Sequence, residues 1–341
     1  METVREVKMP KTDCKWFKGQ IPCAPHKKHG HACDDCVHYE PLQGRILIVK
    51  LGAAGDVIRT TPILRKLREL RPDDEICWIT RFPQLVPRSW VDRVLTFTLE
   101  DVLWLQLQRF TWLINLDKDD EAIALAESVE ASSRSGFGMG MFGKCSPIGN
   151  EGEYHKWLTG VWDDANRANS KSYMQEIFDI CGFEFNGEEY IVERPGVRSW
   201  DEIGRDLKVI GLNTGCGSRW PTRLWQDDYW IALARALHTT GYRVVILGGP
   251  QEHERNLHIA AESGVDYFGY MDLAPFIDLV DRCDAVVTQV TMTMHIATGL
   301  GKTVLLMNNI FNSNEFYLYG RGSIIQPNLP CLGCFKQSFD E

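Results

Sequence analysis

Three glycine-containing stretches carry polar side chains at spacings that could support chemistry, and the first is KLGAAGDVIRTTP. Here a buried apolar segment runs into a turn with Gly52 and Gly55, and Asp56 follows where a helix should begin. Glycines let the backbone amides of such a turn surround an anion, but the Gly-Lys-Ser/Thr ending of a P-loop is missing. Asp56 would also repel a phosphate. Local chemistry alone favours an ordinary helix cap at Asp56 over a catalytic acid.

The second stretch, NTGCGSRWPTRLW, has a different chemical character. Its glycines are accompanied by two arginines, Arg219 and Arg223, and by the hydroxyls of Thr214 and Ser218. Arginine side chains pair well with phosphate oxygens, and the start of a helix adds a favourable dipole. The pattern indicates a diphosphate site, with a solvated rim of arginines as the equally weighted alternative.

The third stretch is TQVTMTMHIATGLGK. Thr291 and Thr293 are expected to precede a helix whose first turn carries His295. Hydroxyls and amides at a helix start suit phosphate or sugar oxygens. A single histidine at such a position is more often structural than catalytic.

The first 43 residues contain cysteines at metal-ligand spacing. They follow the pattern Cys14-x8-Cys23-x9-Cys33-x2-Cys36. Four thiols give the ligand count of a tetrahedral zinc or iron site, and this segment has little else to order it. We expect one structural metal here, with its identity open and with no catalytic role, because four thiolates leave no free position. Further possible ligands are His26, His29, His31, and a second CxxC pair, Cys331 and Cys334, if the chain termini meet.

Alternating strand and helix patterns position these stretches. Strands are expected at 45–51, 75–80, 112–117, 208–213, 243–249, 265–270, 284–289 and 303–308, with helical patterns such as 119–131 and 173–185 between them. This alternation predicts an α/β protein with parallel sheets covered on both faces. Residues 136–152 have no clear period and are expected to form a glycine-rich loop.

The strand, glycine turn and helix pattern occurs twice, 163 residues apart when Gly52 is set against Gly215. Two nucleotide-fold halves are therefore predicted, with a ligand between them at the carboxyl ends of the strands. Residues 1–43 are expected to form a cysteine-rich metal-binding extension, 44–195 the first domain and 196–341 the second. Residues 186–199 resemble a domain linker.

Composition restricts the functional class. With 341 residues, 44% hydrophobic and 24% charged, the chain has the composition of a soluble globular protein. A net charge of −9 argues against a dedicated nucleic-acid binder. Neither a signal-peptide pattern nor a transmembrane-length apolar segment is evident, so we expect a cytoplasmic protein whose 11 cysteines are mostly reduced.

Four segments together resemble glycosyltransferase family 9, the bacterial ADP-heptose transferases that include lipopolysaccharide heptosyltransferases. They are LGAAGDVIRTTPIL, GLNTGCGSRWPTRLW, ILGGPQEHE and CDAVVTQVTMTMHIATGLGKTVLL. The similarity covers about residues 45–310, and NNIFNSNEFYLYGRG with the cysteines beyond it is similar to the autotransporter-heptosyltransferase subgroup, some of which have an iron-binding cysteine cluster.

The resemblance implies a GT-B fold, in which two Rossmann-like domains face each other, with the acceptor mainly on the first and the nucleotide sugar mainly on the second. It implies that Asp56 is the general base for inversion at the anomeric carbon, on an acceptor-side turn with Gly52, Gly55 and Thr60. Basic groups and helix dipoles would absorb the charge of the leaving diphosphate, so no catalytic divalent metal is expected. The donor-binding residues implied are Thr214, Gly215, Ser218, Arg219, Arg223, Thr291, Thr293 and His295.

The sequence departs from the family in two places. A lysine is common before the arginine of the second turn, whereas Ser218 stands here, and Arg223 is expected to supply the missing charge. Relatives usually have Asp-Ser/Thr-Gly-Pro ahead of the helix histidine, whereas this chain has Val290 at the aspartate position. Glu315 is the candidate replacement, with an exposed loop acid as the alternative.

The expected function is transfer of a sugar, with heptose from ADP-heptose as the leading donor, to a saccharide or protein hydroxyl. The activity would place the protein in the EC 2.4 class, in lipopolysaccharide synthesis or protein glycosylation, with homo-oligomerisation as an open possibility. The alternatives are a transferase for another nucleotide sugar and a non-catalytic sugar-nucleotide-binding or assembly protein.

Overall fold

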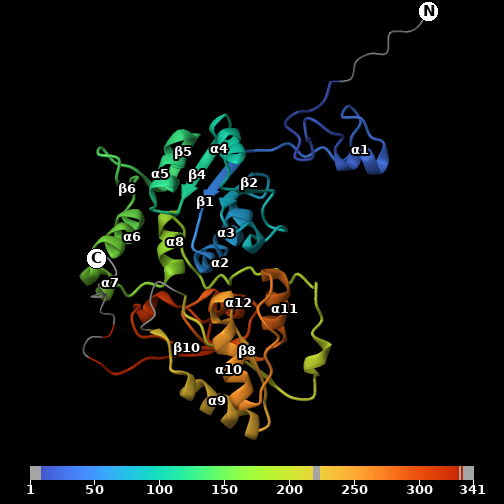
Figure 1. The fold of residues 1–341 in the computed structure, drawn as a ribbon. Helices are drawn as coiled ribbons and strands as arrows, with labels where there is room; N and C mark the ends of the chain where they lie inside the picture. The colour runs from blue at the N-terminus through green and yellow to red at the C-terminus, as the bar shows by residue number, and fades with distance from the viewer. Residues whose placement is uncertain (1–8, 218–222, 330–331, 333–341) are drawn as a thin grey trace, which may run out of the picture.

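The computed structural model describes residues 9–217, 223–329 and 332. Its two sheets lie one above the other in Figure 1, with helices α2 and α8 of the first domain facing α12 and α11 of the second. The amino-terminal extension, with its short helix α1 (Ala24–His29), projects to one side of the first sheet. Within the described residues, no helix has the length and apolar character needed to span a membrane.

The first domain is built on a six-stranded sheet of order β3-β2-β1-β4-β5-β6. The strands are β1 (Arg45–Val49), β2 (Glu75–Thr80), β3 (Arg93–Thr96), β4 (Arg109–Asn115), β5 (Glu130–Met139) and β6 (Cys145–Pro147). The helices are α2 (Ala54–Thr60), α3 (Ile63–Leu70), α4 (Leu99–Gln106), α5 (Asp120–Ser128), α6 (Glu151–Val161), α7 (Asp163–Ala168) and α8 (Tyr173–Ile180), with a 3-10 turn η1 (Pro83–Leu85). All pairs are parallel except β5 with β6, so the sheet is mixed.

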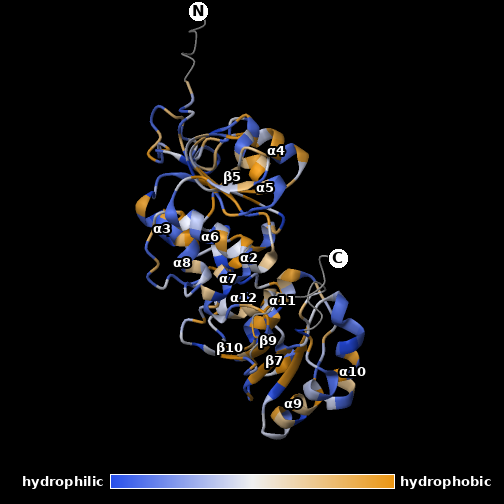
Figure 2. Ribbon diagram, turned by 90° about the vertical axis from the view of Figure 1, so that its left-hand side faces the viewer, coloured by the Kyte–Doolittle hydropathy of each residue, from blue (hydrophilic) through white to orange (hydrophobic). Residues whose placement is uncertain are grey.

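The second domain has a parallel five-stranded sheet of order β11-β10-β9-β7-β8. The strands are β7 (Val209–Asn213), β8 (Arg243–Leu247), β9 (Ala285–Gln289), β10 (Thr303–Met307) and β11 (Gly322–Ile325). The helices are α9 (Asp227–Thr239), α10 (His253–Ser263), α11 (Leu273–Arg282) and α12 (Met292–Gly299), with 3-10 turns η2 (Asp201–Ile203), η4 (Pro250–Glu252) and η5 (Ser313–Glu315). Figure 2 colours the strands around β7 and β9 mainly as hydrophobic and α10 mainly as hydrophilic, as a sheet covered by helices requires.

Each sheet has a point where the strand order reverses. In the first sheet the reversal lies between β1 and β4, and in the second it lies between β7 and β9. Chain connections leave a crevice at such a point, beside the carboxyl ends of the two strands, and ligands of open α/β sheets bind there. The two glycine turns identified in the sequence follow β1 and β7, so each of them lies at a reversal point.

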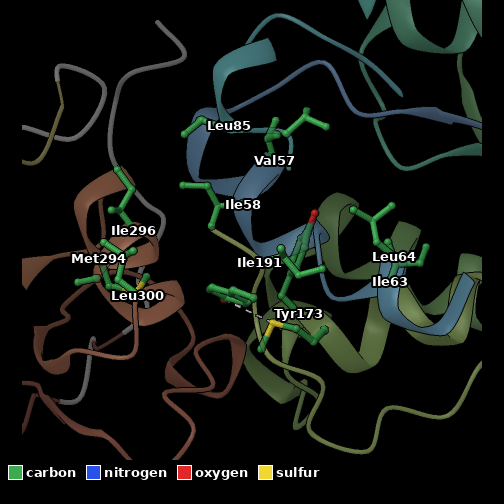
Figure 3. Close-up of a cluster of buried hydrophobic side chains, with 14 of the residues drawn as sticks. Val57, Ile58, Ile63, Leu64, Leu85, Tyr173, Ile191, Met294, Ile296 and Leu300 are labelled. Atoms are coloured by element: carbon green, nitrogen blue, oxygen red, sulfur yellow. Dashed lines mark hydrogen bonds between the residues drawn. The ribbon is translucent and has the colours of Figure 1, made fainter. Parts of the chain in front are cut away.

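A continuous apolar cluster joins the two domains. Figure 3 shows Ile58 of α2 and Leu85 on the first domain's side, with Met294, Ile296 and Leu300 from α12 and the residue that follows it on the other. All five side chains are at most 6% exposed and belong to one buried cluster. Burial at this seam brings the start of α2 close to α12.

The segment predicted as a linker, 186–199, is attached to both domains. The amide of Ile191 donates to the Thr61 hydroxyl of the first domain at 2.8 Å. The amides of Gly196, Val197 and Arg198 donate to the Asp278 carboxylate of the second at 2.7–2.9 Å. These bonds hold the domains in a defined relation.

The prediction of a long loop at 136–152 is wrong. Residues up to Met139 continue β5, and Cys145–Pro147 form β6, which pairs with β5 in an antiparallel hairpin. Gly136 has a φ of 101°, and a Cβ added to it would lie 1.8 Å from the Asn115 carbonyl oxygen of β4. Strand β5 therefore needs a glycine where β4 approaches it. Because glycine has no side chain, the alternation of apolar and polar side chains that identifies a strand is lost here.

The strand predicted at 265–270 is also absent from the described structure, where only an isolated bridge pairs Asp266 with Val245 of β8. Besides β5 and β6, two short strands, β3 and β11, were not predicted. Both lie at the edge of a sheet, where fewer side chains are buried and the apolar pattern is weaker.

Candidate active site

The carboxylate of Asp117 fills the first glycine turn. It follows β4 and accepts hydrogen bonds from the backbone amides of Leu51 and Gly52, the latter at 3.3 Å, and it forms a short ion pair with Lys50 at the end of β1. These amides are the groups that would otherwise cradle a phosphate. The turn is thus occupied by the protein's own anion, which agrees with the expectation that it is poorly suited to phosphate.

Asp56 lies in the first turn of α2, beside this pair. One carboxylate oxygen accepts from the Ala53 amide at 3.3 Å and lies 3.9 Å from the Lys50 ammonium. The other accepts from Nε of Arg59 at 2.9 Å. The side chain still exposes 31% of its surface, so it is a cap whose carboxylate also reaches solvent. Capping and access to a ligand are therefore compatible at this residue.

The surrounding cations keep Asp56 ionised. Partial burial alone would raise the pKa of its carboxyl group, but the charges of Arg59 and Lys50 outweigh this effect and lower the pKa to about 2. In Lys50 the penalty of burial is likewise outweighed, and Tyr173 with the carboxylates of Asp117 and Asp56 raises the pKa of its ammonium group. At neutral pH the site therefore contains two carboxylates and two cations.

Arg59 connects this carboxylate to the second domain. Its Nη1 lies 3.5 Å from Oε2 of Glu315, which is on η5, and its guanidinium stacks over the Tyr173 ring with the central carbon 3.5 Å from the ring centroid. Glu315 is only 13% exposed and also lies 3.4 Å from the side-chain amide of Asn166. The structure thus brings Glu315 into the same charged cluster as Asp56.

The remaining acceptor-side residues have packing roles in the structure. The Thr60 hydroxyl donates to the Asp56 carbonyl at 2.7 Å and lies 3.3 Å from the Tyr173 hydroxyl. A Cβ added to Gly55 would lie 2.5 Å from Cδ2 of His295. Glycine at position 55 therefore permits the close approach of α2 to α12.

His295 faces this cluster from α12 as a neutral side chain. It is 4% exposed, and Nδ1 has no hydrogen-bond partner among the described residues. Burial, reinforced by the charge of Arg59, lowers the pKa of its imidazole to about 3. At neutral pH His295 is therefore not a cation available to a diphosphate.

Because the His295 imidazole is buried and neutral, we expect the stability of the folded protein to decrease in acid. Between pH 6.5 and about 3 the unfolded chain binds one more proton at this residue than the folded protein, so stability falls by about 1.4 kcal/mol per pH unit as the pH drops. Urea denaturation at pH 7, 6 and 5 should show this slope in the wild type, whereas His295→Gln should lack it. Equal slopes in the two proteins would show that His295 titrates normally.

The second reversal point is organised by Asn213. This residue ends β7, and its side-chain amide donates to the hydroxyls of Thr288 and Thr291 at 3.0 and 3.2 Å. Its carbonyl oxygen accepts from the Thr293 hydroxyl at 3.1 Å. The predicted residues Thr291 and Thr293 thus lie together at the start of α12, beside the end of β7.

The rest of the predicted donor turn is only partly available to a ligand. The Thr214 side chain is buried, and its hydroxyl donates to Asn256 at 2.5 Å. Arg223 donates to the carbonyl oxygens of Val290, at 2.7 Å, and of Cys216, so it connects the loops after β7 and β9. Gly215 packs so closely that an added Cβ would lie 2.5 Å from the Glu252 carboxylate. The predicted residues Ser218 and Arg219 lie outside the described residues.

A pocket of about 600 Å³ lies on the second sheet, and neither Thr291 nor Thr293 lines it. It is lined by residues of β9, β10 and β11 that include Val287, Gln289 and Met307, and by Arg223. Among the predicted donor residues that the structure describes, only Arg223 contributes to it. The chemistry gathered around Asp56 therefore does not coincide with this pocket.

The four amino-terminal cysteines are free thiols that line one small cavity. In the described part of the chain, however, no three or more His, Cys, Asp or Glu side chains are grouped so that they could hold a metal ion. The second pair, Cys331 and Cys334, lies outside the described residues. The extension is far from the charged cluster at α2 (Figure 1).

Sequence reasoning missed Lys50, Arg59 and Asp117. Lys50 lies in the predicted first strand, 45–51, and a lysine in an otherwise buried apolar run indicates a paired charge, because burial of an isolated charge is costly. Arg59 is one helical turn after Asp56, which is the spacing of a helical ion pair. The partner Asp117 is 67 residues from Lys50, and only the order of strands brings the two together.

Comparison with known proteins finds a partial match to one family and one similar relative. Residues 198–319 match the model of glycosyltransferase family 9 (heptosyltransferase). The chain is 22% identical over 315 residues to lipopolysaccharide heptosyltransferase 1 of Pseudomonas aeruginosa, covering 86% of this chain and 87% of that protein.

Solved structures share the fold. A glycosyltransferase of family 9 from Veillonella parvula aligns with a TM-score of 0.66 at 17% identity, covering 84% of this chain and 87% of that one. The dodecameric iron-containing heptosyltransferase TibC of enterotoxigenic E. coli, in complex with ADP-D-beta-D-heptose, aligns with a TM-score of 0.55 at 11% identity, covering 86% of this chain and 64% of that one.

The two facing domains, the reversal points and the family match agree with one another. The protein is therefore a glycosyltransferase, and its second domain matches glycosyltransferase family 9.

Proposed function

We propose that the protein is an inverting glycosyltransferase that transfers heptose from ADP-heptose to a saccharide or protein hydroxyl. The observation that carries this proposal is the ionised, partly exposed Asp56 carboxylate at the seam between the two domains. The similarity to a lipopolysaccharide heptosyltransferase and to a structure containing ADP-D-beta-D-heptose supports the choice of donor.

In the proposed reaction, Asp56 accepts the proton of the acceptor hydroxyl. The freed oxygen forms a bond to the anomeric carbon on the face opposite the diphosphate, and the bond from that carbon to the phosphate oxygen breaks, so ADP leaves with the electron pair. A carboxylate with a pKa of about 2 is a weak base. The negative donor would compete for Arg59 at the seam and raise the pKa of Asp56 in the complex.

The donor would lie against the second domain, near the end of β7 and the start of α12. Asn213 holds Thr291 and Thr293 there, and the amides at the helix start are suited to phosphate oxygens. Arg219 is assigned to the diphosphate on the family resemblance alone. Glu315 is proposed to contact the sugar, because it faces the first domain beside Arg59.

A thermal-shift screen with ADP-heptose, ADP and other nucleotide sugars tests the donor. A ligand at 100 times its Kd stabilises the folded protein by about 2.7 kcal/mol, so the true donor should raise Tm most at equal concentration. ADP-heptose should exceed ADP because its sugar adds contacts at the seam. If ADP-heptose raises Tm no more than ADP does, the heptose assignment is wrong.

A transferase for a different nucleotide sugar is the second candidate, and Val290 favours it. Where family members have an aspartate, this apolar side chain packs against the core, and its carbonyl accepts from Arg223. A larger shift with another nucleotide sugar in the same screen would select this alternative. A non-catalytic sugar-nucleotide-binding protein would show a shift without turnover.

Three further expectations stay predictions. They are a cytoplasmic location, assembly into a homo-oligomer and independence from a catalytic divalent metal. The relative TibC is described as dodecameric, and size-exclusion chromatography with light scattering would measure the oligomeric state of this chain.

A further inference from the structure

The pocket on the second sheet is separate from the charged cluster around Asp56. Its floor is formed by three neighbouring strands, β9, β10 and β11, and Leu233 of α9 contributes to its wall. The apolar floor residues are Val287, Leu305, Met307 and Ile325. The volume of about 600 Å³ is that of a small-molecule site, which typically measures roughly 300–1,000 Å³ and is mostly apolar with a few placed polar groups.

The floor is one face of the sheet. Gln289, Met307 and Ile325 are paired neighbours across the three strands, and Leu305 pairs with Val287 in the row beside them. Side chains of a strand alternate between the two faces, so the residues between these positions point to the opposite face. There they join the buried cluster that contains the side chains of α12. The pocket therefore lies on the face that α12 does not cover.

Gln289 brings an unpaired amide group to this pocket. It is the last residue of β9 and lines the pocket together with Val287, two positions earlier. Gln289 is 2% exposed, and neither the nitrogen nor the oxygen of its side-chain amide has a hydrogen-bond partner among the described residues. A buried amide without partners costs free energy. A ligand that pairs with both atoms would remove this cost.

Arg223 adds an open donor next to this amide. Its Nη1 donates to the carbonyl oxygen of Val290, the residue after Gln289, at 2.7 Å. Its Nε is buried and has no partner among the described residues, and the side chain lines the same pocket. Two donor groups and one acceptor are thus left open beside an apolar floor.

We propose that this pocket binds a nucleobase, at a site separate from that of the sugar donor. A planar ring suits an apolar floor, and its edge has groups that donate and accept hydrogen bonds side by side. Glutamine pairs with such an edge through two hydrogen bonds, as it does with N6 and N7 of adenine. Nε of Arg223 would donate to a further acceptor on the same ligand.

Other classes of ligand would leave part of this arrangement unsatisfied. A hydrocarbon chain would match the floor but would leave the Gln289 amide without partners. An ionised phosphate or carboxylate only accepts hydrogen bonds, so the oxygen of the amide would remain unpaired. The hydroxyl groups of a sugar could pair with the amide, but others would lie against the apolar side chains of the floor.

The pocket adjoins the proposed donor site and lies on a different side of β9. Thr288, the residue before Gln289, points to the opposite face, where its hydroxyl accepts from the Asn213 amide. Asn213 also holds Thr291 and Thr293 at the start of α12, and neither threonine lines the pocket. A nucleobase in the pocket and a donor beside α12 could therefore be bound at the same time.

The test is isothermal titration calorimetry of the full chain with adenosine and, separately, with uridine. These nucleosides carry a base without a phosphate, and comparing them shows which base edge the pocket prefers. Gln289→Leu should weaken binding of the preferred nucleoside about 5- to 150-fold, the usual effect of losing a bidentate pair with a base. Its Tm should not fall, because the substitution removes a buried unpaired amide.

Two further variants keep the test independent of the fold. Gln226→Leu makes the same change at an exposed position outside the pocket, where the side chain forms no cap hydrogen bond with α9. It should bind the nucleoside as the wild type does. Leu305→Trp would fill the pocket from its floor, so it should lose nucleoside binding although Gln289 is intact.

Several outcomes would overturn the proposal. These are an absence of binding by either nucleoside at millimolar concentrations, equal affinity in Gln289→Leu and the wild type, and unchanged binding in Leu305→Trp. Loss of binding in Thr293→Val with full binding in Gln289→Leu would place the base in the donor site instead. None of these measurements uses sugar transfer, so a failed pocket assignment and a failed transferase assignment can be told apart.

Discussion

Replacing Asp117 with asparagine is expected to destabilise the first domain by about 3–5 kcal/mol, because it leaves the Lys50 ammonium buried without a counter-charge. The side chains of Lys50 and Asp117 are each 5% exposed and pair directly. Asparagine is nearly the same size and can still accept from one backbone amide. The loss would therefore come from the charge. Urea denaturation followed by tryptophan fluorescence measures it.

Two further variants separate the buried charge from other causes. Lys50→Met in the Asp117→Asn background removes the unpaired cation and should recover most of the lost stability. Glu130→Gln breaks the ion pair between Arg109 and Glu130. The side chains of these two residues are 83% and 67% exposed, and their ion pair also connects two neighbouring strands, β4 and β5. This control should change stability by less than about 1 kcal/mol. A double variant as unstable as the single one would contradict the charge explanation.

The strands and their glycine turns could be predicted because their signals are local. The β2 strand has the predicted bounds, 75–80, and β1, β7, β9 and β10 lie within the predicted segments. In a parallel sheet the strands are buried on both faces and appear as short continuous apolar runs. The glycine-rich part of β5 has few side chains, so this apolar signal disappears although the backbone pairing of the strand is regular.

The residues of the candidate site could be predicted within each domain, but not the contacts between the two domains. Asp56 and His295 were identified from separate turns, but their proximity depends on α2 packing against α12 through Gly55. That His295 is neutral also depends on this contact, because burial and Arg59 together lower the pKa of its imidazole. The helix contact and the lowered pKa both depend on residues more than 200 positions apart. The spacing of residues along a single sequence does not predict such long-range contacts.

The largest effect on turnover is expected at position 56, where the proposed function places the general base. Asp56→Asn should lower turnover about 10²- to 10⁴-fold, the usual contribution of a positioned general base, while the thermal shift with donor stays close to that of the wild type. Asparagine keeps an oxygen that can accept from the Ala53 amide, so the start of α2 should remain capped. Initial-rate assays with the donor identified by the screen provide the measurement.

Asp164→Asn is the matched control for this experiment. Asp164 also lies in the first turn of a helix and pairs with an arginine three residues later, Arg167, at 2.5 Å, but its side chain is 95% exposed. If capping and helical ion pairing were all that Asp56 contributes, both variants would keep their turnover. Loss in Asp56→Asn alone, with donor binding retained, requires that the carboxylate act on the acceptor. Unchanged turnover in Asp56→Asn would mean that the base is another group, because an amide at position 56 cannot accept the proton.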